Sequence, residues 1–285
     1  MKTPITYYGG KQTLVKRLLA LIPQHVLYCE PFFGGGALFF AKPPSNVEVI
    51  NDTNGEVMIF FKVVQTKFKE LEKEIKSTLH SRMLWKKARV IYENSEMFSD
   101  VKRAWAFWTL ANQGFAGLLT SWSFGKDDSK EDSVAKKRDD FSKIYADRLK
   151  KVQIECNDAI RVIKLRDFNK AFFYCDPPYI NTHQGHYKGY MEADYIRLLN
   201  ALTKIKGKFL LSSYPNAILK KYIKKYKWNV YSVTKKIAVT KLTDKIKTEV
   251  MVFNYDEKDT GIYELDRKML KDLQSQLKKL KIVKR

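Results

Sequence analysis

Four consecutive residues, Asp176-Pro177-Pro178-Tyr179, carry the strongest chemical signal in the chain. They directly follow Ala171–Cys175, a continuous apolar run typical of a central parallel strand. Two consecutive prolines fix φ and remove two backbone donors, so the chain must turn sharply where this strand ends. We expect the Asp176 carboxylate and the Pro177 carbonyl to face a common point, where two acceptors suit an amine, and Tyr179 to stack on a base. The alternative is an ordinary Asp-Pro turn.

A glycine turn, Gly34–Gly36, lies between a predicted strand, Val26–Glu30, and a helix that begins at Ala37. Glycine at such a place allows the backbone to approach a ligand closely. The segment lacks the Gly-Lys-Ser/Thr ending of a phosphate loop, and Phe32 and Phe33 would make a poor phosphate cradle. A ligand with an amino-acid end and an adenosine end fits better than a nucleoside triphosphate. The alternative is a glycine turn that is merely flexible.

The elements around these motifs predict an α/β fold. A strand at Val47–Asn51 ends at Asp52, and the order strand, glycine turn, helix, strand, acid is typical of an α/β nucleotide site. Strand character returns at Val152–Cys156, shortly before Asp158, and at Phe209–Ser212. We further predict helices at Gln12–Ile22, Asp194–Ile205 and Lys220–Tyr226, and paired strands at Trp228–Val239 and Glu249–Tyr255.

Apolar residues recur at helical spacing between residues 55 and 150, which predicts a helical insert there. Lys126–Asp140 is polar and charged, and we predict a loop for it. The predicted core then comprises residues 1–54 and 151–256. A charged tail, residues 257–285, is predicted to form a C-terminal helix.

The order of the motifs resembles the Dam-like family of DNA adenine-N6 methyltransferases. The resemblance rests on Tyr8-Gly-Gly-Lys11, Glu-Pro-Phe-Phe-Gly-Gly-Gly at 30–36, Asp52 after the next strand, and Asp-Pro-Pro-Tyr at 176–179. It implies a Rossmann-like S-adenosylmethionine-dependent methyltransferase core with a mostly helical target-recognition insert. Weaker matches are Asp158, Ser212-Ser213 and Thr248–Tyr255.

The resemblance also implies a binding site for S-adenosyl-L-methionine. Tyr8 and Lys11 would contact its methionine end, and Asp52 would accept bonds from the ribose hydroxyls. Asp158 would bind the adenine amine; surface charges are the alternative for Lys11 and Asp158. The implied cofactor-binding residues are Tyr8, Lys11, Glu30, Pro31, Phe32, Gly34, Asp52, Asp158 and Asp176.

The implied catalytic residues are Asp176, Pro177, Pro178 and Tyr179. An adenine inside a stacked duplex is out of reach, so the base must flip out. Asp176 and the Pro177 carbonyl would accept its N6 hydrogens while Tyr179 stacks on the ring. The nitrogen would then attack the sulfonium methyl group in line, without a metal, and catalysis would come from positioning and electrostatics.

The resemblance also implies that the insert reads the target through Ala111–Gly125, with Asn112 and Gly117 as DNA-binding residues. The arginine and the Asn-x-Pro-Phe-Gly ending of relatives that recognise GATC are absent, so GATC is not indicated. Tyr187 lies in a glycine- and tyrosine-containing segment, Ile180–Tyr190, that would close over the flipped base or form a plain surface loop.

Charge points to a polyanionic partner. Lys and Arg outnumber Asp and Glu by 53 to 31, a net charge of +22, and residues 200–248 hold thirteen lysines and one aspartate. Lysines that neutralise phosphates release counterions, so the charge favours a nucleic acid, and the resemblance implies double-stranded DNA as partner. The alternative is a set of solvated lysine faces. The predicted phosphate contacts are Lys220, Lys221, Lys236, Lys241 and Lys245.

Other functions stay open at this point. A noncatalytic nucleic-acid binder on a methyltransferase shell and an RNA adenine methyltransferase are the alternatives. Families that methylate cytosine N4 or protein glutamine more often carry Ser or Asn before the two prolines, so Asp176 favours adenine. The recognition sequence, a companion restriction enzyme and the oligomeric state are not indicated by the sequence.

The cell compartment is expected to be the cytoplasm of a bacterial or phage-infected cell. No apolar run is long enough to cross a bilayer, and the first residues form no apolar signal segment. The three cysteines, Cys29, Cys156 and Cys175, are far apart and are expected to be buried, reduced thiols. Neither cysteines nor histidines have the spacing of a metal site.

Overall fold

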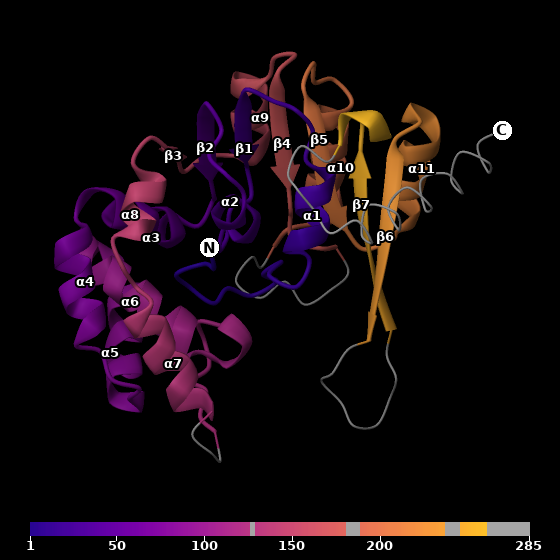
Figure 1. Ribbon diagram of the computed structural model, residues 1–285. Coiled ribbons are helices and arrows are strands. Elements are labelled where there is room, and N and C mark those ends of the chain that lie inside the picture. Colours follow the sequence, from indigo (N-terminus) through magenta and orange to yellow (C-terminus); the bar gives the residue numbers. More distant parts are fainter. Residues whose placement is uncertain (126–128, 181–188, 237–245, 261–285) are drawn as a thin grey trace. The chain divides into compact units, whose positions relative to one another are not determined.

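The computed structural model describes residues 1–285 except 126–128, 181–188, 237–245 and 261–285 (Figure 1). The chain divides into two compact units. The helical unit comprises Met1–Gln12 and Phe33–Asp158, and the sheet unit comprises Thr13–Phe32 and Ala159–Arg285. The predicted domain boundaries, 1–54 with 151–256, 55–150 and 257–285, stay a prediction, and most of the predicted C-terminal helix lies outside the described residues.

The sheet unit contains strands in the order β1-β4-β5-β7-β6. β1, β4 and β5 are parallel, whereas β7 is antiparallel to both β5 and β6 (Figure 1). All five residues of β4 are buried, as expected for a central parallel strand without a polar face. Because β4 and β5 are parallel, their carboxyl ends lie side by side. This is the edge of the sheet at which α/β proteins bind their ligands. The strands are β1 Leu27–Glu30, β4 Ala171–Cys175, β5 Lys208–Ser213, β6 Asn229–Lys236 and β7 Ile246–Phe253.

Helices of the sheet unit are short and follow the strands in alternation, as a parallel sheet requires. The carbonyl of Leu21, at the end of the first helix, accepts a hydrogen bond of 2.6 Å from the buried Tyr255 hydroxyl. This bond attaches the helix to the end of the antiparallel hairpin. The helices are α1 Val15–Leu21, α9 Ala159–Arg166, α10 Glu192–Leu202 and α11 Ala217–Tyr226.

The helical unit pairs two parallel strands with a group of helices. β2 Val47–Asn51 runs parallel to β3 Gln153–Glu155. Helix α6 is buried along most of its length and packs against α3, α4, α5 and α7, so it forms the centre of the group. The helices are α2 Ala37–Ala41, α3 Gly55–Thr66, α4 Phe68–Lys76, α5 Arg82–Glu93, α6 Asp100–Gln113, α7 Ser129–Asp139 and α8 Ile144–Leu149.

The loop predicted at Lys126–Asp140 is wrong, because α7 occupies most of it. Acids in its first turn (Glu131, Asp132) and bases in its last turn complement the helix dipole, and Val134 is buried. The polar composition concealed this helix because one buried apolar residue is too few to show a period.

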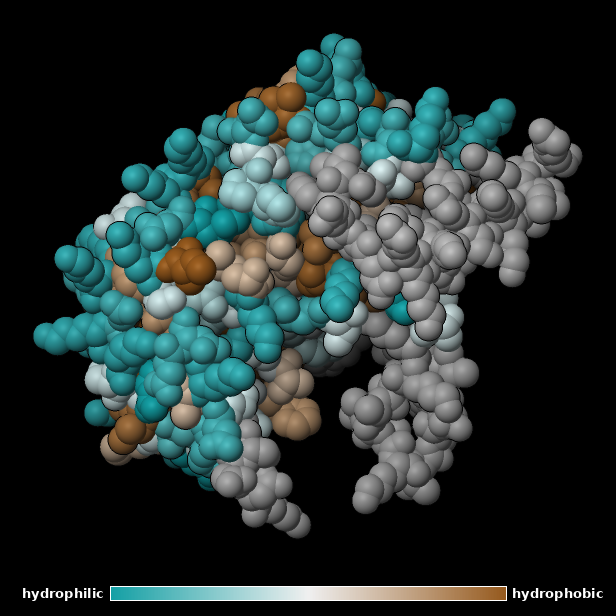
Figure 2. Space-filling model, viewed as in Figure 1, coloured by the Kyte–Doolittle hydropathy of each residue, from teal (hydrophilic) through white to brown (hydrophobic). Residues whose placement is uncertain are grey.

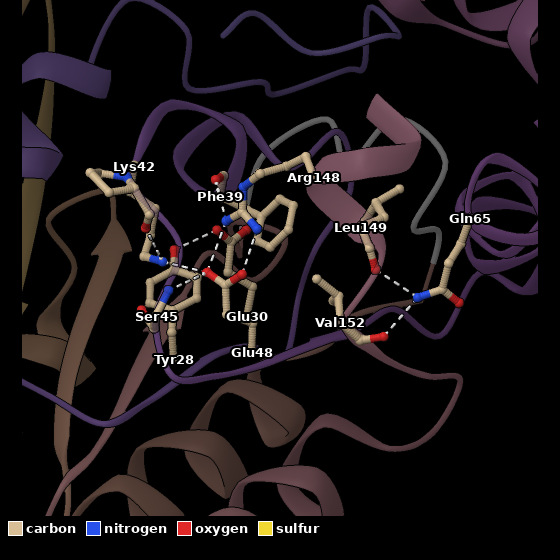
Figure 3. A network of polar contacts seen from close by, with 11 residues as sticks. Tyr28, Glu30, Phe39, Lys42, Ser45, Glu48, Gln65, Arg148, Leu149 and Val152 are labelled. Atoms are coloured by element: carbon tan, nitrogen blue, oxygen red, sulfur yellow. Dashed lines mark hydrogen bonds and ion pairs between the residues drawn. The ribbon is translucent and has the colours of Figure 1, made fainter. Parts of the chain in front are cut away.

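A buried ion cluster holds α2, β2 and α8 together (Figure 3). Glu48 accepts hydrogen bonds from Lys42 at 2.5 Å and from both terminal nitrogens of Arg148 at 2.5 and 2.8 Å. The Arg148 guanidinium also lies 3.7 Å from the ring centroid of Phe39 and donates to its carbonyl. Burial raises the pKa of Glu48, but the hydrogen bonds and charges of Arg148 and Lys42 outweigh it, so the net shift is downward.

The surface is hydrophilic over most of the coloured area in Figure 2, as expected for a chain of net charge +22. Wherever helices are described, none combines the length and the apolar character needed to cross a bilayer. The three cysteines are free thiols; Cys29 and Cys175 are buried as predicted. The prediction is wrong for Cys156, which is exposed because it follows the short strand β3 rather than lying inside it.

Candidate active site

The helical unit places Asp52 directly against the glycine turn. The buried Asp52 carboxylate accepts one hydrogen bond from the Gly34 amide at 2.8 Å and another from the Asn54 amide at 2.9 Å. The turn itself requires glycine, because a Cβ on Gly36 (φ +67°) would lie 2.4 Å from the Phe33 ring. Two amide donors fix the orientation of the carboxylate, and a carboxylate has about four acceptor positions. A carboxylate oriented in this way suits the two hydroxyl groups of a diol.

Asp52 and Asp158 follow neighbouring strands that are linked at their ends. The Asn51 side chain, which is completely buried, donates to the Asn157 carbonyl at 3.1 Å and accepts from the Asn157 amide at 2.8 Å. This reciprocal pair fixes the carboxyl ends of β2 and β3 against each other. Asp158 is exposed and follows immediately, so the two carboxylates stand at adjacent strand ends.

The N-terminal segment with Tyr8 and Lys11 is held by α6. Asn112 accepts from the Thr6 amide at 2.9 Å and donates to the Pro4 carbonyl at 3.3 Å. Lys11 is buried and donates to the Gly9 carbonyl at 3.0 Å, so it is not a plain surface charge. Gly117 lies against the backbone of this segment. The structure thus brings the predicted residues Lys11, Asn112 and Gly117 into one packed region.

The DNA-binding roles of Asn112 and Gly117 stay predictions. Asn112 is buried and uses its amide group to position the N-terminal segment. In the structure, Asn112 therefore supports the segment that carries Tyr8.

In the sheet unit, Asp176 and Tyr179 follow the end of β4 and lie next to each other. The Tyr179 hydroxyl donates to the Asp176 carboxylate at 3.3 Å. Burial raises the pKa of Tyr179, and the negative charges of Asp176 and Glu249 raise it further, so the phenol stays protonated and remains a donor. Pro177, which lies between Asp176 and Tyr179 in the sequence, is buried, and its fixed φ holds the turn rigid.

A second tyrosine, Tyr214, stands beside Tyr179 at the end of β5. The two rings pack edge to face, with centroids 4.5 Å apart and an interplanar angle of 65°. The Tyr214 carbonyl accepts from Ser213 at 3.0 Å and from Asn216 at 3.1 Å, and Ser213 in turn accepts from Tyr195 at 3.0 Å. These bonds fix Tyr214. The sequence analysis did not predict Tyr214 as a site residue. Its place directly after Ser212-Ser213 could have indicated it, but no spacing pattern points to this tyrosine.

β1 contributes the remaining predicted residues of the sheet unit. Glu30 is buried and accepts a hydrogen bond of 2.5 Å from Tyr28 (Figure 3). Pro31 is buried as well, and Phe32 packs edge to face against Tyr190 with centroids 6.4 Å apart. The parallel pairing of β1 with β4 fixes this segment in the sheet.

The predicted phosphate-contacting lysines are only partly described. Lys220 and Lys221 are exposed on α11. Lys236 ends β6, but its side chain lies outside the described residues, as do Tyr187, Lys241 and Lys245. Among the side chains with described positions, no cluster of three or more His, Cys, Asp or Glu residues has the arrangement of a metal site.

Known proteins resemble the chain over almost its full length. It is 26% identical over 273 residues to type II methyltransferase M1.LlaDCHI of Lactococcus lactis subsp. cremoris, covering 87% of this chain and 93% of that protein. It is 26% identical over 296 residues to type II methyltransferase M.MjaIII of Methanocaldococcus jannaschii, covering 90% and 99%.

A precorrin-6y C5,15-methyltransferase from Geobacter metallireducens GS-15 is a more distant structural match. It has 9% identity and a TM-score of 0.33, over 89% of this chain and 97% of that one. A likeness this weak does not bear on fold or function.

The family profile is decisive. The profile of the D12 class N6 adenine-specific DNA methyltransferases matches residues 7–258, a span that includes the glycine turn, Asp52 and the Asp176–Tyr179 turn. This protein is an S-adenosylmethionine-dependent enzyme with a Rossmann-like methyltransferase core, and it belongs to the D12 class N6 adenine-specific DNA methyltransferase family.

Proposed function

We propose that the enzyme methylates N6 of an adenine rotated out of double-stranded DNA, and that Asp176, Pro177 and Tyr179 hold that amine. The observation that carries the proposal is the turn after β4, where the Tyr179 hydroxyl donates to Asp176 and the Tyr179 ring packs on Tyr214. An adenine N6 group offers two N–H donors, and the turn offers a carboxylate and a peptide carbonyl as acceptors. Rotation of the base out of the duplex is required because its N6 is paired and stacked there.

The cofactor-binding residues of the helical unit fit S-adenosylmethionine. The glycine turn presents backbone without side chains, and the fixed Asp52 carboxylate suits the two ribose hydroxyls. The exposed Asp158 carboxylate, one strand over, suits an adenine amine. Tyr8 and Lys11 are assigned to the methionine end. When bound, this cofactor supplies a methyl group on a positively charged sulfur, which leaves as a neutral thioether.

In the proposed mechanism, Asp176 accepts one N6 hydrogen and the Pro177 carbonyl accepts the other. These bonds raise the electron density on nitrogen and aim its lone pair at the methyl carbon. The bound cofactor would supply its methyl group to this nitrogen, and the proton that the methylated amine gives up would be released to water. Tyr179 donates to Asp176, which fixes the carboxylate. Catalysis then comes from positioning and from preorganised electrostatics.

The experiment is methyl transfer from radiolabelled S-adenosylmethionine to mixed-sequence duplex DNA, with cofactor affinity measured by calorimetry. Asp176→Asn should lower kcat by about 100- to 1000-fold, the order found for loss of one preorganised electrostatic contact, and leave the cofactor Kd within a few-fold. Tyr179→Phe retains the ring and should lose much less than Tyr179→Ala. An equal loss of transfer and cofactor affinity in Asp176→Asn would contradict the assigned role.

Duplex DNA is proposed as substrate because of the family and the exposed lysines of α11. Transfer to single-stranded RNA in preference to duplex DNA would favour an RNA methyltransferase, and cofactor binding without transfer to any nucleic acid would favour a noncatalytic binder. We also propose that the enzyme acts in the cytoplasm and belongs to restriction–modification, since its relatives are type II methyltransferases. Methylated adenines in DNA from cells that express the chain would show that the enzyme reaches cellular DNA, and protection of that DNA from a companion restriction enzyme would test the second assignment.

A further inference from the structure

An exposed arginine, Arg82, lies on a stack of aromatic rings in the helical unit. Its guanidinium carbon is 4.6 Å from the ring centroid of Trp122 and 5.6 Å from that of Phe124. Trp122 and Phe124 are themselves stacked, with centroids 5.6 Å apart and planes 21° apart. His80 also stacks on the Trp122 ring, with ring centroids 5.0 Å apart and an angle of 26° between the ring planes. Phe124 is 63% exposed, so the stack reaches the surface.

The backbone around this stack is well fixed. Trp122 forms an antiparallel bridge with Gly114, and the Ser123 amide donates to the Gln113 carbonyl at 2.9 Å. The Gln113 side chain accepts from the Ser81 amide at 3.3 Å. Gln113 therefore joins the start of α5 to the segment that carries Trp122. His80 is held between Glu131 and the Ser123 carbonyl, each 3.0 Å from a ring nitrogen.

No acidic side chain among the described residues neutralises the charge of Arg82. Its side chain forms no ion pair among the described residues, whereas Arg89 on the same helix bonds Glu93 at 2.7 Å and Arg103 on α6 bonds Glu56 at 2.5 Å. Arg82 is also the first residue of α5, where the helix dipole disfavours a cation. A placement that opposes a local preference is expected most often at functional sites.

The chemistry of a stacked guanidinium identifies the partner. A guanidinium that lies flat on a ring keeps the N–H groups of its plane available as a rigid fork of donors, and the Arg82 guanidinium lies over the Trp122 ring. Such a fork matches the O6 and N7 acceptors of guanine in the major groove, the commonest specific contact between arginine and DNA. Two neighbouring rings restrict where the guanidinium can lie, and such preorganisation favours base reading over a contact with a phosphate charge, which needs no fixed plane.

We propose that Arg82 is a specificity-determining residue that reads a guanine in the target sequence, with Trp122 and Phe124 as the platform that orients it. The inference rests on the proposed function, since it names part of the DNA that the enzyme recognises. It predicts that the recognition sequence contains at least one guanine besides the methylated adenine.

The test compares wild-type enzyme with Arg82→Lys and Arg82→Ala. Methylated sites are mapped on genomic DNA lacking adenine methylation, and kcat/KM is measured on duplexes changed one base pair at a time. Both variants should lose discrimination by about 5- to 150-fold at a single guanine and keep it at the other positions. Arg82→Lys retains the charge but not the planar fork, so it should behave like Arg82→Ala.

Arg89→Lys and Arg89→Ala are matched controls, because Arg89 lies on the same helix with its guanidinium carbon 5.9 Å from the Trp85 ring but is paired with Glu93. They should leave the recognition sequence unchanged. Uniform weakening by Arg82→Ala on all sequences, with a shallower salt dependence and rescue by lysine, would assign Arg82 to a phosphate and overturn the proposal. Unchanged specificity in both Arg82 variants would overturn it too.

Selection of duplexes from a random library by binding alone separates this inference from the proposed reaction. Enrichment of a guanine by the wild type that disappears in Arg82→Ala supports the inference even when no methyl group is transferred. Transfer to adenine by a wild type that enriches no guanine contradicts the inference and leaves the proposed function intact.

Discussion

Gly117 lies so close to Tyr7 that a Cβ at position 117 would come within 2.9 Å of the Tyr7 carbonyl carbon and of the Tyr8 amide nitrogen. Its φ of +76° is also strained for any other residue. Gly117→Ala should therefore lower the free energy of unfolding by about 1–3 kcal/mol and weaken cofactor binding, because the segment that carries Tyr8 must move. Urea denaturation and calorimetry measure the two effects.

The matched control for this substitution is Gly55→Ala. A Cβ at Gly55, the first residue of α3, would meet no heavy atom within 4 Å. The change should be neutral or stabilise by about 0.4–1 kcal/mol and leave the cofactor Kd unchanged. Equal stability and affinity in both variants would show that Gly117 does not support the Tyr7–Tyr8 segment.

Asp52→Asn should weaken cofactor binding before it affects the rate at saturating cofactor. The substitution removes a charged acceptor that the Gly34 and Asn54 amides orient. Loss of a hydrogen bond to a charged group corresponds to about 10- to 150-fold in Kd. Asp147→Asn, on an exposed carboxylate of α8, serves as control for the lost charge. An unchanged Kd in Asp52→Asn would remove Asp52 from the cofactor site.

Glu48→Gln should lower the free energy of unfolding at pH 7 by about 3–5 kcal/mol, since it leaves the buried cations Lys42 and Arg148 without their counter-charge. The pKa of Glu48 is lowered in the folded protein, so its carboxylate stabilises the fold at pH values above the ordinary pKa of glutamate. That stabilisation should be lost as the pH falls below about 4.3 and through the folded-state pKa. The difference between wild type and variant should shrink over this range.

Denaturation curves at pH 7 and pH 3.5 check this prediction. Glu93→Gln, which breaks the exposed pair with Arg89, is the control and should cost at most about 1 kcal/mol. A Glu48→Gln variant as stable as Glu93→Gln would mean that Lys42 and Arg148 find other partners.

Lys220→Ala/Lys221→Ala should flatten the salt dependence of duplex DNA binding. Each lost phosphate contact reduces the slope of log K against log salt by about 0.9. Lys164→Ala/Lys170→Ala removes the same number of exposed charges from the sheet unit and is the control. If both double variants show the wild-type slope, the lysines of α11 only contact solvent.

The strands beneath the site were predictable where the buried pattern was continuous. β2 and β4 have the predicted bounds, because both are mostly apolar and buried and are directly followed by an aspartate, Asp52 or Asp176. The last strand was predicted two residues too far, to Tyr255 instead of Phe253. There the Asn254 side chain bonds the Phe209 amide and the Gly207 carbonyl, which takes the place of further ladder pairing. When a polar side chain replaces backbone pairing at the end of a strand, the hydrophobic pattern of the sequence does not show where the strand ends.

Residues that support the site were harder to predict than those that form its motifs. Asn51 looked like the last residue of a strand, and its reciprocal bond with Asn157 depends on a partner 106 residues away. Arg82 and Trp122 are likewise joined only by the fold. Local sequence reveals a strand end and its turn, but a contact between distant segments depends on packing that no short pattern encodes.

Burial of Cys29 and Cys175 leaves Cys156 as the single accessible thiol of the chain, two residues before Asp158. A maleimide dye would therefore attach at one defined position, beside the carboxylate assigned to the cofactor's adenine. Fluorescence of the labelled enzyme would then follow cofactor arrival and departure in real time without any engineered cysteine.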